Sequence, residues 1–139
     1  MLERYKDGDG VSFADHRALL PERAADFPAA GIVRDGEALE LIGWRFPRCQ
    51  VCGERGGNRH HIIGGAGRSD EATNLIVLCG SGNASGCHAE AHGGELTLAR
   101  ILWYKWRQDR ANLSWVRLAI LRRGHLPRPE PPRKEVADE

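Results

Sequence analysis

The chain is organised around residues 49–92, which read CQVCGERGGNRHHIIGGAGRSDEATNLIVLCGSGNASGCHAEAH. This segment holds all four cysteines of the chain, four of its six histidines and its densest run of glycines. Cysteine and histidine side chains gathered in so short a segment are typical of metal ligands rather than of core packing. We therefore interpret residues 49–92 as a metal-binding module that the rest of the chain supports.

The four cysteines fall into two pairs. Cys49 and Cys52 have the spacing C-x2-C, 26 residues follow, and Cys79 and Cys87 have the spacing C-x7-C. Four thiolates can enclose one zinc ion in a tetrahedral site that leaves no position for water or substrate, so such a zinc is structural. A redox-active C-x-x-C and buried free thiols are the alternatives, but a redox motif leaves the second pair unexplained. The glycines after the first pair predict a knuckle whose backbone N–H groups point at sulfur.

The hydrophobic pattern predicts a small α+β fold. Short apolar runs at 60–63 and 74–78 predict two strands, and the run at 38–46 predicts a third that leads into the first cysteine pair. Residues 87–92 predict the beginning of a helix, which the two glycines that follow either cap or bend. Apolar residues at helical spacing predict another helix within 95–109, and Ser114 is placed to cap a further one.

These elements divide the chain into four segments. Residues 1–45 form an N-terminal extension with short helices and a strand, and residues 46–94 form the metal-binding module. Residues 95–124 form a basic helical segment, and residues 125–139 form a Pro-rich, charged tail. The chain of 139 residues is thus a small domain with extensions.

Charge and hydropathy bound the partners and the compartment. The net charge of +1 gives no overall preference for a polyanion, but residues 100–123 hold seven basic side chains against one acidic, which favours local contact with phosphate. No apolar run fits a signal peptide or approaches the roughly 18 residues of a membrane span. We therefore expect a cytoplasmic protein, in the host cytoplasm if it is phage-encoded, without membrane association. In that compartment paired cysteines bind metal more often than they form disulfides.

Four motifs occur in order along this module: the C-x2-C pair, RHHII at 59–63, TNLIVLC at 73–79 and CHAEAH at 87–92. Together they resemble the signature of the HNH endonuclease family, in which a His-His or Asp-His pair, an asparagine and a final histidine surround one metal ion. The resemblance covers about a third of the chain. It implies a ββα-metal, treble-clef-like core with a structural zinc knuckle and flanking helices. The implied activity is hydrolysis of DNA phosphodiester bonds, by nicking or by double-strand cleavage.

The resemblance also implies a role for each histidine of the module. His60 is expected to bind the catalytic metal ion, and His61 to act as the general base that activates water, a role that suits an imidazole near neutral pH. Asn74 is expected to orient His61 through a hydrogen bond. His88 and His92 are four residues apart, so their imidazoles face the same way on a helix, and we take both as metal ligands.

The two sites have different expected contents. The cysteines are expected to hold a structural Zn²⁺, and the three histidine ligands one catalytic divalent ion, Mg²⁺, Mn²⁺, Ni²⁺ or Zn²⁺. Imidazole ligands favour zinc or nickel over magnesium. Because many relatives carry Asp at the position of His60, the identity of the catalytic ion is left open.

Four basic residues are the predicted DNA contacts: Arg59, Arg68, Lys105 and Arg107. A solvated surface charge is the alternative for the two arginines that lie within the module. The resemblance further implies a bacteriophage or restriction context, with the phage terminase large subunit as a partner in genome packaging. Two functions without catalysis stay open: a zinc-stapled DNA-binding module and a terminase-accessory module. Substitution of His61 separates these hypotheses, because only a nuclease needs that side chain.

Overall fold

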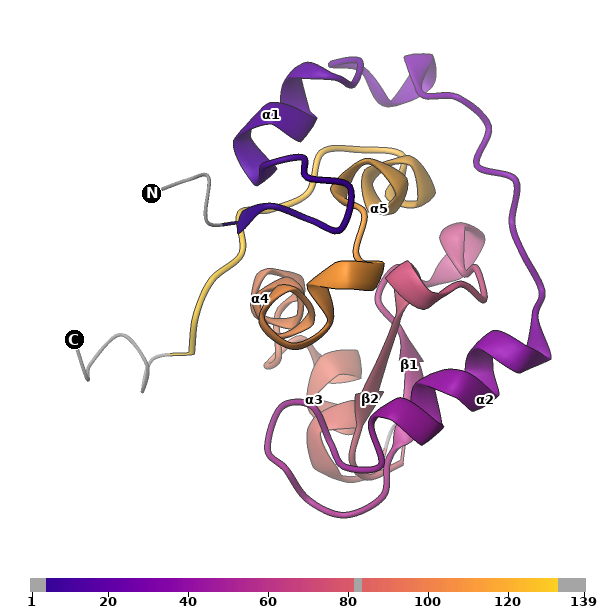
Figure 1. Cartoon of the computed structure of the whole chain (residues 1–139), viewed down its shortest axis with the longest axis vertical. Helices are drawn as coiled ribbons and strands as arrows, with labels where there is room; N and C mark the ends of the chain where they lie inside the picture. Colours follow the sequence, from indigo (N-terminus) through magenta and orange to yellow (C-terminus); the bar gives the residue numbers. More distant parts are fainter. Residues whose placement is uncertain (1–4, 82–83, 133–139) are drawn as a thin grey trace.

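The structure is a computed structural model that describes residues 5–81 and 84–132. Within these residues the chain forms five α-helices and one two-stranded antiparallel sheet, so the expected small α+β fold is confirmed (Figure 1). The helices and strands are α1 (Phe13–Ala18), α2 (Gly36–Arg45), β1 (Asn58–His61), β2 (Leu75–Leu78), α3 (Gly86–Gly93), α4 (Leu98–Asp109) and α5 (Trp115–Arg122). None of the described helices is long and apolar enough to cross a membrane.

The hairpin formed by β1 and β2 lies in the middle of the molecule, between α2 on one side and α3 and α4 on the other (Figure 1). Strand β2 is buried along its whole length. Its side chains alternate, since Ile76 and Leu78 join the main core, whereas Leu75 and Val77 pack against Ile42 of α2. A strand that is covered on both faces needs apolar residues at every position, which explains the unbroken LIVL sequence of β2.

The strand predicted at 38–46 is wrong, because this segment forms helix α2. Asp35 caps the helix: its side chain accepts the backbone N–H groups of Glu37 at 3.0 Å and of Ala38 at 3.4 Å. The apolar residues Ala38 and Ile42 lie four positions apart and face β2 together. This spacing and the Asp35 cap are helical signals that the short apolar run concealed.

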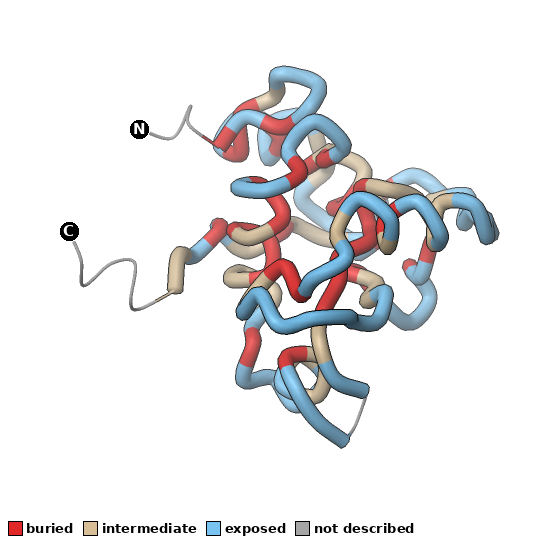
Figure 2. The backbone as a smooth tube through the Cα atoms, turned by 60° about the horizontal axis from the view of Figure 1, so that its bottom comes forward, coloured by how far each residue is buried: buried red, intermediate tan, exposed pale blue. Residues whose placement is uncertain are grey.

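The two C-terminal helices confirm the prediction of an amphipathic α4 and a Ser114-capped α5. Thr97 caps α4 through the N–H of Arg100 at 3.3 Å, and Ser114 caps α5 through the N–H of Arg117 at 3.1 Å. Both helices belong to the main core, which draws buried residues from each of the four sequence segments. These residues include Phe13, Phe27, Ile62, Ile76, Leu102, Trp106, Trp115, Leu118 and Leu126. Figure 2 marks the buried stretches of the backbone in red.

The described parts of the two ends of the chain pack against this core. Trp115 donates its Nε1–H to the carbonyl of Tyr5 at 2.6 Å, and its backbone N–H to Asp7 Oδ2 at 2.9 Å. Near the other end Leu126 is buried, and the N–H of Glu130 donates to the carbonyl of Ala99 at 3.0 Å. The rest of the predicted Pro-rich tail, residues 133–139, lies outside the described residues.

Candidate metal centres

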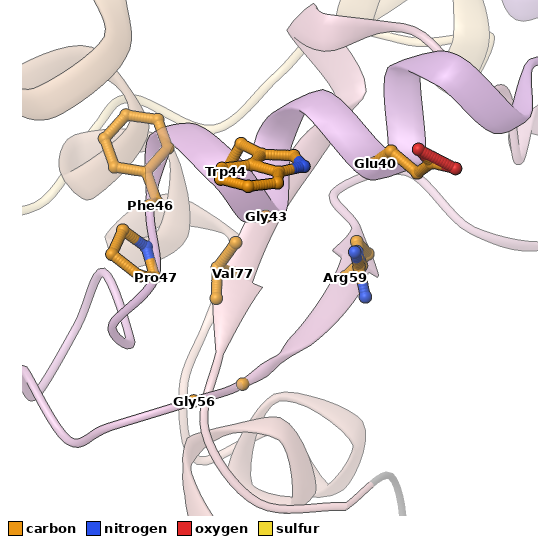
Figure 3. Close-up of a pocket in the computed structure, with 9 residues that line it drawn as sticks. Glu40, Gly43, Trp44, Phe46, Pro47, Gly56, Arg59 and Val77 are labelled. Carbon is orange, nitrogen blue, oxygen red and sulfur yellow. The ribbon is translucent and has the colours of Figure 1, made fainter.

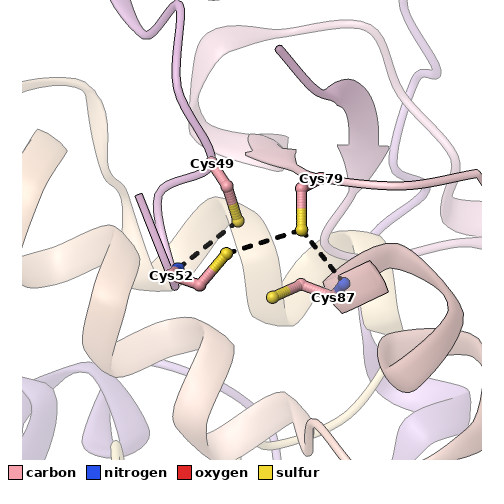
Figure 4. A group of neighbouring side chains, drawn as sticks. All are labelled: Cys49, Cys52, Cys79 and Cys87. Carbon is pink, nitrogen blue, oxygen red and sulfur yellow. Dashed lines mark hydrogen bonds between the residues drawn. The ribbon is translucent and has the colours of Figure 1, made fainter. Parts of the chain in front are cut away.

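Four cysteine side chains converge beside the hairpin (Figure 4). Cys49 and Cys52 lie on the turn that follows α2, Cys79 comes directly after β2, and Cys87 lies in the first turn of α3. The four Sγ atoms all lie within 4.8 Å of one another, and those of Cys52 and Cys79 are 3.5 Å apart. A tetrahedral zinc site with Zn–S bonds of about 2.3 Å places its sulfur atoms about 3.8 Å apart. The cluster therefore fits a structural zinc, as the cysteine spacing predicts.

Backbone N–H groups point at these sulfur atoms, as expected of a knuckle. The N–H groups of Val51 and Cys52 donate to Cys49 Sγ at 3.4 and 3.5 Å, and the N–H of Cys87 donates to Cys79 Sγ at 3.3 Å. Burial by itself raises the pKa of Cys49, but these N–H donors outweigh it and lower that pKa to about 7. Burial and the charge of Cys49 raise the pKa of Cys87. A divalent cation bound to the cluster would favour the thiolate form of Cys87.

The long C-x7-C spacing is accommodated by a closed loop between Cys79 and Cys87. Ser81 and Ser85 pair across the neck of this loop, and two glycines flank it with positive φ angles, 85° at Gly80 and 71° at Gly86. The backbone around Gly80 leaves no room for a side chain, since a Cβ on Gly80 would lie 2.0 Å from the carbonyl oxygen of Ser85. The insertion therefore leaves Cys87 close to Cys79 and does not separate the pair.

A second cluster contains three histidines. His60 comes from β1, and His88 and His92 lie one turn apart on α3. Their ring centroids are 4.8–5.5 Å apart, and one ring nitrogen from each can be chosen so that all three lie within 4.8 Å of one another. Burial and the neighbouring His88 and His92 lower the pKa of His60 to about 4, and burial also lowers the pKa of His88. These two imidazoles are neutral near pH 7, which is the form that binds a metal ion.

His61 lies beside this cluster and is oriented by Asp70. His61 Nε2 is 2.7 Å from Asp70 Oδ1, and the two side chains are only 11% and 13% exposed. The hydrogen bond to His61 is the main reason that the pKa of Asp70 is lowered. Because an ionised carboxylate can only accept, Nε2 of His61 donates the proton of this bond, and Nδ1 is left as an acceptor. This arrangement gives His61 a fixed tautomer and one free basic nitrogen.

The expected hydrogen bond between Asn74 and His61 is wrong. Asn74 is fully buried; its Oδ1 accepts the N–H of Ile63 at 2.7 Å, and its Nδ2 donates to the carbonyls of Ile63 and Ser69 at 3.1 Å each. Asn74 directly precedes β2, so its side chain reaches the loop between the strands rather than the histidine. It closes that loop and thereby positions Asp70. Sequence reasoning missed Asp70, since an acidic residue in a glycine-rich loop has no diagnostic spacing.

The histidines share one cavity of about 390 Å³, which His60, His61, His88 and His92 line together with Arg59 and Arg68. Both arginines are exposed, and no acidic side chain among residues 5–81 and 84–132 lines this cavity. Two guanidinium groups beside a cluster of neutral imidazoles make the cavity attractive to an anion. Arg59 and Arg68 thus line the histidine cavity, and their contact with DNA stays a prediction.

The prediction of Lys105 as a DNA contact is wrong, because its side chain is completely buried. Lys105 Nζ donates to the carbonyls of Ala72 and Leu75 and to Asp109 Oδ2, each at 2.7 Å. It therefore ties α4 to the beginning of β2, and the basic composition of the segment conceals this structural role. Arg107 is exposed, but its guanidinium lies 5.2 Å from the ring centroid of Trp103 and does not line the histidine cavity.

Comparison with protein-family models, with curated proteins and with solved structures finds no match to this chain. The structure thus provides a four-cysteine cluster and a three-histidine cluster in a small α+β fold with a two-stranded hairpin. The HNH family stays a prediction from the sequence motifs.

Proposed function

We propose that the chain is a metal-dependent endonuclease of the HNH type, which hydrolyses DNA phosphodiester bonds by nicking or by double-strand cleavage. The observation that carries this proposal is the convergence of three potential ligands with a fourth, carboxylate-bound histidine in one cavity. The order of the elements, β1, β2 and α3, is also that of a ββα-metal core. The cysteine cluster then serves as the structural zinc site of the same module.

His60, His88 and His92 would hold one divalent ion, for which neutral imidazoles favour zinc or nickel over manganese and magnesium. Such an ion, when bound, supplies Lewis acidity at a phosphate oxygen and at the leaving oxygen. The three imidazoles come from two elements, and β1 and α3 are both held in place by the core and the cysteine cluster. The protein therefore positions these ligands without help from the catalytic ion.

His61 supplies the proton transfer. Its Nδ1 accepts a proton from a water molecule whose oxygen attacks phosphorus, while the bond from phosphorus to the 3′ oxygen of the DNA breaks. Asp70 keeps the proton on Nε2 and stabilises the imidazolium that forms. Arg59 and Arg68 lie where they can neutralise the phosphates on either side of the scissile one. The general base is thus held by a residue other than Asn74.

The test is cleavage of supercoiled plasmid by the wild type and by His61→Ala, in EDTA and after addition of magnesium, manganese, nickel or zinc. Removal of a general base slows such reactions about 10²- to 10⁴-fold, so the variant should leave the plasmid intact under conditions in which the wild type cuts it. His125→Ala is the matched control, since His125 packs against Phe27 and lines no part of the cavity. Circular dichroism confirms that each variant is folded.

Equal cleavage by His61→Ala and the wild type would show that His61 is not the base or that a contaminant cuts the plasmid. Absence of cleavage by both, with DNA retained in a gel shift, would favour a zinc-stapled DNA-binding module. The proposal extends to phage genome packaging beside the terminase large subunit, as the resemblance implies. In that context cleavage should change when the large subunit is added, whereas weak activity that appears only with this partner would favour a terminase-accessory module.

A further inference from the structure

A second cavity, of about 470 Å³, lies between α2 and the segment that enters β1 (Figure 3). We call it the Trp44 pocket; Glu40, Gly43, Trp44, Gly57 and Arg59 are among its lining residues. It is separate from the three-histidine cluster, but Arg59 lines both cavities. Arg59 can therefore contact a molecule that occupies either cavity.

Trp44 is exposed and, unlike the other three tryptophans, is not part of the core. Its side chain is 80% exposed, whereas Trp103, Trp106 and Trp115 are all at most 8% exposed. Figure 3 shows its indole ring projecting from α2 between Phe46 and Glu40. Such a ring presents a large flat face, which is the surface on which a nucleic-acid base stacks.

Arg59 is held at the boundary between the two cavities. Its Nε donates to the carbonyl of Leu39 at 2.8 Å, so the side chain lies along α2. Gly43 provides the room for this arrangement, since a Cβ there would lie 2.7 Å from Arg59 Nη2. The guanidinium group is thus fixed near both cavities, where one phosphate between two successive nucleotides would meet it.

We propose that the Trp44 pocket binds an unpaired base of the DNA strand whose scissile phosphate enters the histidine cavity. This inference rests on the proposed nuclease function and names the form of its substrate. The base stacks on Trp44, and Arg59 contacts the phosphate that connects it to the next nucleotide. Glu40 disfavours a phosphate inside the pocket, but its carboxylate can accept hydrogen bonds from the amino group of a base. A base inside a duplex has no free face, so the bound nucleotide is single-stranded or flipped out.

The test is a titration of a fluorescein-labelled single-stranded oligodeoxycytidine with the whole chain, without added divalent metal, in which the anisotropy of the label gives the affinity of every variant, and the tryptophan fluorescence of the wild type is recorded alongside. Because the other three tryptophans are buried, quenching by the strand reports mainly on Trp44. We expect quenching by the single strand, and a loss of affinity of about 10- to 100-fold in Trp44→Ala, from the typical energy of one base stacked on an aromatic ring. Trp44→Phe, which keeps a smaller aromatic face, should recover part of this affinity. A duplex of the same length should quench much less.

Leu41→Ala is the matched control, because Leu41 is also exposed on α2, at 59%, but does not line the Trp44 pocket. The proposal is overturned if Trp44→Ala binds the single strand as tightly as the wild type, or if Leu41→Ala loses as much affinity. It is also overturned if Trp44 holds two copies of the chain together, as shown by a dimer in sedimentation that Trp44→Ala dissociates and that the single strand leaves unchanged. Plasmid cleavage is measured separately, so Trp44-dependent binding without cleavage would reject the nuclease and retain the pocket.

Discussion

The two clusters contain similar numbers of metal-ligating side chains but lie in different surroundings. Helix α3 contributes to both, since Cys87 belongs to the cysteine cluster and the next residue, His88, to the histidine cluster. Around the cysteines, backbone N–H groups donate to sulfur, and Cys49 and Cys87 are buried. Each cluster has one exposed member, Cys52 and His92, but around the histidines a cavity of about 390 Å³ stays open. The surroundings of the ligands, more than their number, separate a closed site from one that has room for a substrate.

A metal ion should stabilise the fold more when it binds to the cysteine cluster than when it binds to the histidine cluster. The cysteines join the knuckle, β2 and α3, which are far apart in the sequence, so a metal ion bound there stabilises the fold directly. The histidines come from elements that are already held together, β1 by its pairing with β2 and α3 by Cys87. An ion bound to the histidines therefore adds little to the fold. Substitutions in the two clusters should separate stability from activity.

The largest effect is expected from Cys87→Ser. Structural zinc supplies about 10–16 kcal/mol in small zinc modules, which is comparable to the whole stability of an ordinary domain. Loss of one thiolate should release the zinc and abolish the cooperative thermal transition of the protein. Zinc per chain, measured by plasma mass spectrometry, and unfolding followed by circular dichroism check this expectation.

Ser85→Ala is the control for Cys87→Ser, because Ser85 is exposed and its side chain makes no capping hydrogen bond to α3. This variant should keep one zinc ion and the transition of the wild type. A Cys87→Ser protein that retains both would show that the cysteine cluster is not a structural zinc site, and the contrast between the clusters would disappear.

His88→Ala should give the opposite result at the neighbouring position. Alanine is the better helix former by a few tenths of a kcal/mol, and the cysteine cluster is untouched. We therefore expect the free energy of unfolding to stay within about 0.5 kcal/mol of the wild-type value. Removal of a ligand should nevertheless reduce plasmid cleavage at least about 10²-fold. Cleavage and unfolding are measured on the same preparation. A His88→Ala protein that unfolds as readily as Cys87→Ser would show that the histidine cluster is also structural.

Asp70→Asn should have an intermediate effect, confined to the histidine cavity. Outer partners of functional imidazoles typically contribute about 10- to 100-fold, and an amide in place of the carboxylate can turn His61 to the wrong tautomer. We expect a loss of cleavage in this range, with the three metal ligands and the zinc content unchanged. Asp70→Glu, which keeps the carboxylate, should recover part of the lost cleavage, and this rescue distinguishes the role from a purely structural one. Equal losses in Asp70→Asn and Asp70→Glu would contradict the assignment.

The sequence predicts the cysteine cluster better than the surroundings of the histidine cluster. Cysteine spacing, the glycines of the knuckle, the two strands and the cap at Ser114 are local patterns, and local patterns determine most of the cysteine site. The spacing of His88 and His92 places them one helical turn apart, whereas their convergence with His60 is what the family resemblance implies.

The features that the sequence conceals depend on contacts between distant segments. Asp70 lies in a loop without regular structure, and contacts with distant residues bring it to His61: Asn74 holds the neighbouring Ser69, and Asp70 itself bonds to Val33 and Asp35. Lys105 has the composition of a DNA contact, yet it is buried because Asp109 and two backbone carbonyls surround its ammonium group. The stretch 38–46, which forms α2, is ambiguous in sequence because nine mostly apolar residues fit the period of a strand and of a helix about equally well.

The smallest expected effect concerns acid pH. The pKa of His60 is lowered from 6.5 to about 4 in the folded protein, first by burial and then by His88 and His92. The folded state therefore binds fewer protons than the unfolded state between these two values, and its stability should fall as the pH decreases through this window. Above pH 6.5 His60 contributes no pH dependence of its own. Without a bound metal ion, His60 therefore lowers the free energy of unfolding at acid pH.

His60→Gln removes this contribution while keeping a polar side chain of similar length. Between pH 7 and about pH 5 the wild type should lose about 1 kcal/mol more than the variant, once the partial exposure of His60 is discounted. Urea unfolding at both pH values checks this, without added metal, and groups common to both proteins cancel in the difference. Cys52→Ser serves as the contrast, since its defect should be present at both pH values. If His60→Gln and the wild type lose stability in parallel, His60 is solvated like an ordinary histidine, and the cavity that distinguishes the two clusters is more open than the structure indicates.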